Sequence, residues 1–176
     1  MTGGLLIRSL FESHGGRPAH WDALFRRKTE IYRDLVRDEL KLMPGALELL
    51  ADLRENRVRC AVATSASRVT MDVVFAATGL ARYFDATVTL ENVARPKPDP
   101  EAFFKAAQLL NTPAAQCIVI EDALKGITAA KAANMLCVVV PTALSRSEDL
   151  QVADLVVESL EQLSTERLAA LVEGRS

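Results

Sequence analysis

Short apolar runs alternate with segments of helical periodicity from Pro44 onward, and this alternation limits the possible folds more than any other feature of the chain. The runs are rich in β-branched residues and cover 58–64, 84–90, 117–121, 136–140 and 154–158. Strands that are apolar on both faces are typical of parallel sheets, which helices cover on both sides. The pattern therefore predicts an α/β protein with a parallel sheet.

Helices are expected between and after these runs, at 46–55, 68–78, 100–110, 124–133 and 163–173. Ser67 is placed to cap the second of these helices, and Gly79 is placed to end it in the left-handed conformation. The segment 95–100 holds three alternating prolines, which exclude both a helix and a sheet ladder and so predict a loop.

The first 42 residues differ from the rest because they show helical periodicity without a strand pattern. Apolar side chains recur at steps of three and four from Trp21 to Leu40, which predicts an amphipathic helix. A shorter helix is expected at 5–12, and a hinge at 43–45. We therefore divide the chain into a helical segment, 1–42, and an α/β core, 43–176.

Charge and composition exclude several classes of partner. The 176 residues carry 21 Lys and Arg against 23 Asp and Glu, a net charge of −2, which argues against a nucleic acid or an anionic membrane surface. No apolar stretch approaches the roughly 18 residues that span a bilayer, and no signal peptide is recognised. Cys60, Cys117 and Cys137 are widely spaced and odd in number, so we expect reduced core residues of a cytoplasmic protein.

Candidate site residues lie at three places: after two of the expected strands and within the proline-rich loop. Parallel sheets form their binding sites at the carboxyl ends of their strands. The candidates are Ser65 after the run 58–64, Lys97 in the proline-rich loop, and Glu121 and Asp122 after the run 117–121. A hydroxyl, an ammonium and a carboxylate pair suit a phosphate beside Mg²⁺. Each residue alone also has a structural explanation: a helix-capping serine, a solvated lysine, or acids that face a helix N-terminus.

Three motifs in this order carry a family resemblance. They are VATSAS at 62–67, KPDPEAF at 97–103 and CIVIEDALKGITAAKAANM at 117–135. Together they resemble the haloacid dehalogenase superfamily, in particular its β-phosphoglucomutases and small sugar-phosphate phosphatases. The resemblance covers almost the full chain, and it implies a Rossmann-like core with a parallel sheet, preceded by part of an α-helical cap.

The resemblance implies a role for each residue of the predicted site. Ser65 would bind the transferring phosphoryl group through its hydroxyl, helped by the amide of Ala66. Lys97 would neutralise the phosphate and the nucleophile, and Asp122 with Glu121 would hold Mg²⁺. The implied reaction is attack by an aspartate on the phosphoryl group of a small phosphorylated metabolite, which gives an aspartyl-phosphate.

The helical segment contributes one further candidate. A cap Arg-Lys followed four residues later by Tyr contacts the substrate in the β-phosphoglucomutase-like pattern, and Arg27, Lys28 and Tyr32 match it. The resemblance thus makes Lys28 a candidate substrate-binding residue, with a solvated helix lysine as the alternative. We place Ser67 in the same group, with a helix cap as its alternative.

The sequence departs from the family pattern at Pro96, Ala123 and Asn134, where the family often has Gly, Ser and Gly. Asn tolerates the left-handed conformation, so the last change is mild. The decisive departure concerns the nucleophile, which the family carries as D-x-D at the end of a first strand. No two aspartates in this sequence are separated by a single residue.

The family's first strand lies between the two strands that correspond here to 58–64 and 117–121. Without it, we expect a gap in the sheet, which the protein could close by pairing these strands directly or by taking a strand from another molecule. Three accounts fit: a fragment of a complete enzyme, a truncation that binds phosphate without turnover, or half of a two-chain enzyme. The resemblance thus implies Mg²⁺-dependent phosphatase or phosphomutase ancestry. From the missing motif and strand we expect little activity in this chain and self-association through exposed strand edges. The alternative is a non-catalytic protein that binds phosphometabolites.

Overall fold

The computed structural model describes residues 23–24, 27–28, 30–34, 40–143, 145 and 150–174. Most of the predicted helical segment 1–42 therefore lies outside the described residues, including the whole helix expected at 5–12. Residues 30–34 are helical, as the periodicity predicts. The α/β core is described almost completely.

The core alternates strands and helices in the predicted order. Its main elements are α3 (Ala46–Glu55), β1 (Ala61–Ala63), α4 (Arg68–Thr78), β2 (Ala86–Val88), α5 (Glu101–Leu109), β3 (Ile118–Glu121), α6 (Leu124–Ala132), β4 (Leu136–Val139), β5 (Leu155–Val156) and α7 (Thr165–Glu173). Short 3₁₀ helices add η2 (Leu80–Tyr83), η3 (Leu90–Asn92), η4 (Ala114–Gln116) and η5 (Leu160–Gln162). The predicted α/β fold class is confirmed, and every expected strand and core helix is present, several of the strands shortened.

Local signals set several of these boundaries. The hydroxyl of Ser67 accepts a hydrogen bond from the amide of Thr70 at 3.3 Å, and Gly79 ends α4 at a φ of +67°. Asn134 follows α6 at a φ of +57°, the left-handed conformation that asparagine tolerates. Gly45 precedes α3 at +81°, and a side chain there would collide with the backbone of η5. The predicted hinge is thus a turn that only glycine fits.

The strands form two separate parallel sheets. β1 pairs with β2, and β3 pairs with β4, which pairs in turn with β5. β1 and β3 are not hydrogen-bonded to each other, and no other strand of the described part of the chain lies between them. The expected gap in the sheet is therefore present, and direct pairing of these two strands does not close it.

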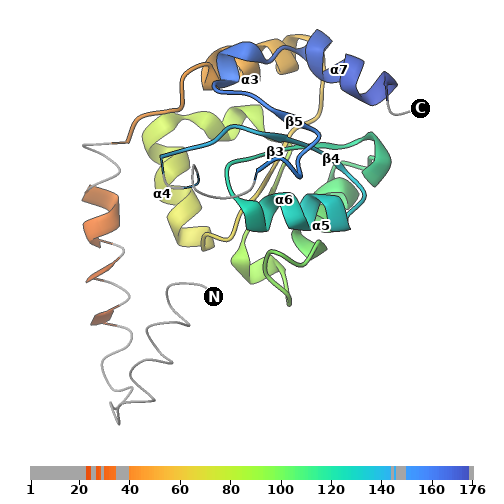
Figure 1. The fold of residues 1–176 in the computed structure, drawn as a ribbon. Coiled ribbons are helices and arrows are strands. Elements are labelled where there is room, and N and C mark those ends of the chain that lie inside the picture. Colours follow the sequence, from red (N-terminus) through yellow and green to blue (C-terminus); the bar gives the residue numbers. More distant parts are fainter. Residues whose placement is uncertain are drawn as a thin grey trace.

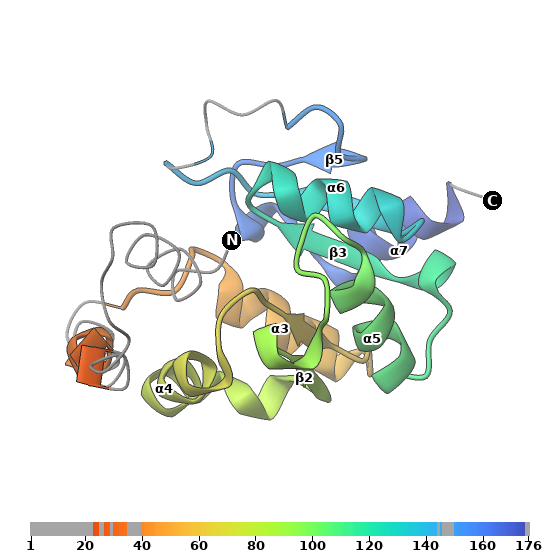
Figure 2. The ribbon, with the colours of Figure 1, turned by 90° about the horizontal axis from the view of Figure 1, so that it is seen from below.

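Helices cover both faces of the larger sheet (Figures 1 and 2). β4 is its central strand, and its side chains alternate between two apolar clusters. Val138 joins the cluster beneath α3 and α7, whereas Cys137 and Val139 join the cluster beneath α5 and α6. Both clusters contain fully buried residues, so most of the hydrophobic stabilisation is concentrated around β4.

The three cysteines are free thiols. Burial raises the pKa of the Cys137 thiol to about 12, so this cysteine stays protonated and acts as a small apolar core residue. Within the described ranges, every helix is too short or too polar to cross a bilayer.

Candidate functional site

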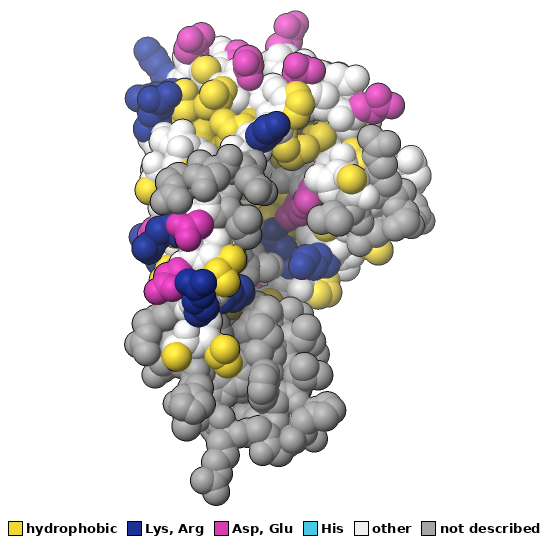
Figure 3. Space-filling view, turned by 90° about the vertical axis from the view of Figure 1, so that its left-hand side faces the viewer, with side chains coloured by type: hydrophobic (Ala, Val, Ile, Leu, Met, Phe, Trp, Pro, Cys, Tyr) yellow, Lys and Arg dark blue, Asp and Glu magenta, His cyan; other side chains and the backbone are white. Residues whose placement is uncertain are grey.

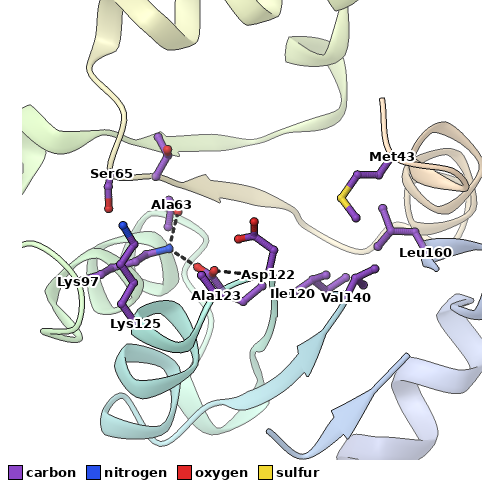
Figure 4. Close-up of a pocket in the computed structure, with 12 residues that line it drawn as sticks. Met43, Ala63, Ser65, Lys97, Ile120, Asp122, Ala123, Lys125, Val140 and Leu160 are labelled. Carbon is purple, nitrogen blue, oxygen red and sulfur yellow. Dashed lines mark hydrogen bonds and ion pairs between the residues drawn. The ribbon is translucent and has the colours of Figure 1, made fainter. Parts of the chain in front are cut away.

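A pocket of about 370 Å³ opens where β1 and β3 end. Its lining residues are Met43, Ala63, Thr64, Ser65, Lys97, Ile120, Glu121, Asp122, Ala123, Lys125, Val140 and Leu160. Figure 3 shows a recess on one face of the molecule with acidic and basic side chains inside it. Figure 4 shows Ser65, Lys97 and Lys125 on one side of the pocket and Met43, Leu160 and Val140 on the other. The pocket thus has a polar half and an apolar half.

Ser65 lies in the loop between β1 and α4, and its side chain lines the polar half. The next residues of the motif are engaged locally. The amide of Ala66 donates to the hydroxyl of Thr64 at 3.0 Å, and the hydroxyl of Ser67 lies 3.0 Å from that of Thr70. Neither Ala66 nor Ser67 is among the lining residues, so for Ser67 the structure shows the helix-cap alternative.

Lys97 is a buried lysine that connects the two sheets. Its ammonium donates to the carbonyl of Ala63 at the end of β1, at 3.0 Å, and forms an ion pair with Glu121 at the end of β3. The Lys97 and Glu121 side chains are only 7% and 12% exposed. The ammonium also lies 4.4 Å from the centre of the Phe103 ring, within the range of a cation–π contact. The alternative of a solvated loop lysine is therefore wrong.

The loop that carries Lys97 is held by Glu101 at the start of α5. The Glu101 carboxylate accepts hydrogen bonds from the amides of Ala94 and Arg95, at 3.0 and 2.9 Å, and pairs with Lys105 at 2.7 Å. The bond from Lys105, followed by the two amide bonds, lowers the pKa of Glu101 to about 2. This carboxylate fixes the path of the chain toward Lys97.

The two predicted metal ligands differ in their surroundings. Glu121 is bound by Lys97 and also accepts the amide of Asp122 at 3.3 Å. The carboxylate of Asp122 extends into the pocket and has no ion-pair or hydrogen-bond partner among the described residues. Mg²⁺ is commonly held by one or two carboxylates with water and substrate phosphate completing its shell. Asp122 fits that role, although the described residues contain no cluster of three candidate ligands.

Gly126 explains how α6 can lie so close to the ion pair. A Cβ at this position would collide with the carboxylate of Glu121. The absence of a side chain at position 126 therefore leaves the space in which Glu121 meets Lys97.

Lys125 is a pocket residue that the sequence analysis missed. It extends from the first turn of α6 beside Lys97 and Ser65, and its side chain is exposed. Its position three residues after Asp122 is the signal that could have identified it. Lys28, the candidate from the helical segment, is exposed and is not a lining residue of this pocket.

Comparison with known proteins assigns the family. A model of the haloacid dehalogenase-like hydrolases matches residues 8–134. The chain is 43% identical over 144 residues to the Arabidopsis thaliana chloroplast protein SUPPRESSOR OF QUENCHING 1, covering 80% of this chain but 13% of that protein.

Two solved structures are also similar. CbbY from Rhodobacter sphaeroides in complex with phosphate has a TM-score of 0.78 and 31% identity, over 84% of this chain and 68% of CbbY. A β-phosphoglucomutase from Clostridium difficile has a TM-score of 0.81 and 27% identity, over 99% of this chain and 78% of the mutase. The matched motifs, the core topology and the family match agree, and the chain belongs to the haloacid dehalogenase-like hydrolases.

Proposed function

We propose that the pocket binds the phosphoryl group of a small phosphorylated sugar or similar metabolite together with Mg²⁺, the arrangement used in phosphatase and phosphomutase chemistry. The observation that carries the proposal is the convergence of Ser65, Lys97 and Asp122, from three separate loops, in one pocket. The CbbY structure in complex with phosphate supports the choice of ligand.

Each of these residues has a defined task in the proposal. The hydroxyl of Ser65 donates to a phosphoryl oxygen, and the ammonium of Lys97 offsets its charge. Asp122 holds Mg²⁺, which supplies a further positive charge beside the phosphoryl oxygens. Lys125 adds a second ammonium on the same side, which favours a substrate with more than one anionic group.

We further propose that a polypeptide of these 176 residues binds such a ligand without turning it over at ordinary rates. The sequence contains no D-x-D motif, and Ser65, Lys97 and Asp122 position and neutralise but do not attack the phosphorus. This makes non-catalytic binding the second candidate function. We also propose a cytoplasmic location from the free cysteines, although the 43% identical plant relative is a chloroplast protein.

Thermal melting with inorganic phosphate, with and without MgCl₂, tests the binding proposal. Phosphate at about 100 times its Kd stabilises the folded state by about 2.7 kcal/mol. We expect Mg²⁺ to strengthen this effect, Asp122→Asn to remove the Mg²⁺ dependence, and Ser65→Ala to weaken phosphate binding. Asp72→Asn is the matched control, because Asp72 is an exposed aspartate on α4 that does not line the pocket.

An assay with p-nitrophenyl phosphate and Mg²⁺ tests the absence of turnover. We expect rates near the uncatalysed background. Turnover of about 1 per second or more that is abolished by Asp122→Ala would contradict the proposal. Melting curves that phosphate does not move, with or without Mg²⁺, would contradict both candidate functions.

A further inference from the structure

The loop that carries Ser65 is tied to the segment that follows β2. The amide of Thr64 donates to the carbonyl of Val88 at 2.9 Å. On the other side of Ser65 in the chain, the amide of Leu90 donates to the carbonyl of Ala66 at 3.0 Å. The position of Ser65 therefore depends on a segment whose own residues do not line the pocket.

A side chain of the same segment reaches the start of α4. Oε2 of Glu91 accepts a hydrogen bond from the amide of Arg68 at 3.0 Å. Arg68 is the first residue of α4 and comes three residues after Ser65. Because α4 has no acidic residue in its own first turn, Glu91 supplies the negative charge that is favourable at a helix N-terminus.

The same oxygen of Glu91 is also held from the side of β2. The hydroxyl of Thr89 donates to Oε2 at 2.8 Å. Thr89 is only 1% exposed, and its amide donates to the side chain of Asn92 at 2.8 Å, so its place is fixed by the core and by the 3₁₀ turn. Glu91 thus links a fixed residue beside β2 to the first amide of α4.

Glu91 is itself an exposed residue and does not line the pocket. Apart from its charge, its influence on a bound ligand passes through the loop that leads from Ser65 to Arg68. Glu101 offers a parallel in the same protein, because its carboxylate accepts two amides of the loop that carries Lys97.

We propose that Glu91 is a positioning residue of the candidate site, which holds the start of α4 and thereby keeps the hydroxyl of Ser65 directed into the pocket (Figure 4). This inference rests on the proposed binding of phosphate by Ser65. Without the link, the loop 64–67 also adopts conformations in which Ser65 faces elsewhere, and phosphate binds only the molecules whose loop is competent. The apparent Kd rises in inverse proportion to that fraction.

The charge of Glu91 separates positioning from simple electrostatics. A carboxylate near the site repels phosphate, so its removal would by itself strengthen phosphate binding. Loss of positioning has the opposite effect and weakens binding. Both hydrogen bonds go to one oxygen, so glutamine retains the acceptor without the charge, whereas aspartate retains the charge on a shorter side chain.

Isothermal titration calorimetry of the full chain with inorganic phosphate, in the presence of MgCl₂, tests the proposal. For Glu91→Ala we expect the Kd to rise about tenfold, as it does when about a tenth of the molecules keep a competent loop. Glu91→Asp should also weaken binding, whereas Glu91→Gln should bind about as tightly as the parent. If circular dichroism shows that Glu91→Ala does not fold, the comparison of Glu91→Asp with Glu91→Gln decides.

Two controls separate positioning from a general loss of stability. Glu48→Ala removes an exposed carboxylate from the first turn of α3, outside the pocket, and should leave the Kd unchanged. In a Ser65→Ala background, Glu91→Ala should have a much smaller further effect, because the hydroxyl that Glu91 positions is absent. A general loss of stability would weaken binding equally in both backgrounds.

Three results would overturn the proposal while the parent still binds phosphate. The first is a Glu91→Ala variant that binds phosphate as tightly as the parent or more tightly. The second is a Glu91→Gln variant that binds as weakly as Glu91→Ala, and the third is an equal loss in both Ser65 backgrounds. A parent chain that binds no phosphate would instead overturn the proposed function, and this inference with it.

Discussion

The core contains two parallel sheets, a two-stranded half and a three-stranded half, which are built from similar residues but differ in how completely they are buried. In the three-stranded half, all four residues of β4 are buried between the two helical layers. In the two-stranded half, all three residues of β1 are only half-buried, although its sequence Ala-Val-Ala is as apolar. Neighbours rather than composition make the difference, because among the described residues β4 has a strand on each side whereas β1 pairs with β2 alone.

This difference places the candidate site at the junction of a well-packed half and a less-packed half. Ser65 follows β1, whereas Glu121 and Asp122 follow β3. Lys97 forms a direct polar link between the halves through Ala63 and Glu121. Phosphate binding should therefore be sensitive to how firmly the halves are held together.

Removal of the Lys97 link should have the largest effect. Lys97→Met leaves the carboxylate of Glu121, which is 12% exposed, without its cation, and a broken buried pair costs about 3 kcal/mol or more. Urea denaturation measures this loss. Lys105→Met is the control, because its pair with Glu101 is more exposed and should cost less than about 1 kcal/mol. Equal losses in the two variants would argue against a link between the halves.

The same substitution in each half tests the burial difference directly. Val138→Ala in β4 removes two methyl groups from a fully buried position and should lower the free energy of unfolding by about 2 kcal/mol. Val62→Ala in β1 alters a half-buried position and should cost about 1 kcal/mol or less. If chemical denaturation gave the larger loss for Val62→Ala, the comparison between the halves would be reversed.

Acid should destabilise both halves, because each contains a carboxylate whose pKa is lowered in the folded protein. Of the effects on stability considered, we expect this one to be the smallest. The pKa of Glu101 is lowered to about 2, so its contribution is complete above its ordinary pKa of 4.5 and is lost as the pH falls from there toward 2. Glu101→Gln should lower the urea midpoint at pH 6. The difference in urea midpoint between this variant and the parent should be smaller at pH 3.

Asp52 is the matching group in the other half, where it accepts the amide of Thr165 at the start of α7 and has a lowered pKa for that reason. For Asp52→Asn, the difference in urea midpoint from the parent should likewise become smaller as the pH falls from 6 to 3. A gap between Glu101→Gln and the parent that stays constant from pH 6 to pH 3 would exclude the proposed role of the Glu101 charge.

The strand and helix order was predictable because apolar runs and caps are local signals. Gly79 and Asn134 take the left-handed conformation expected of them, and α4 has the expected bounds. The strand expected at 84–90 is shorter, Ala86–Val88, because Thr89 begins a capped 3₁₀ turn in which its amide donates to the side chain of Asn92. Such a side-chain interaction competes with the strand and is hard to weigh from sequence alone.

The site was predictable as a set of residues but not as a set of contacts. The motifs indicated Ser65, Lys97 and Asp122, and all three line the pocket. The pairing of Lys97 with Glu121 could not be predicted, because it depends on how two loops far apart in the chain approach each other. Lys125 was missed although it follows Asp122 by only three residues, because its place in the pocket depends on the direction of α6.

The contact between Gly126 and Glu121 has a consequence for protein engineering. The volume that a methyl group would need at position 126 is occupied by the carboxylate of residue 121. Shortening that side chain by one methylene, as in Glu121→Asp, would vacate part of this volume. The effects of substitutions at the two positions on the free energy of unfolding should therefore not add. The Gly126→Ala, Glu121→Asp double variant should lose less of this free energy than the two single variants lose together.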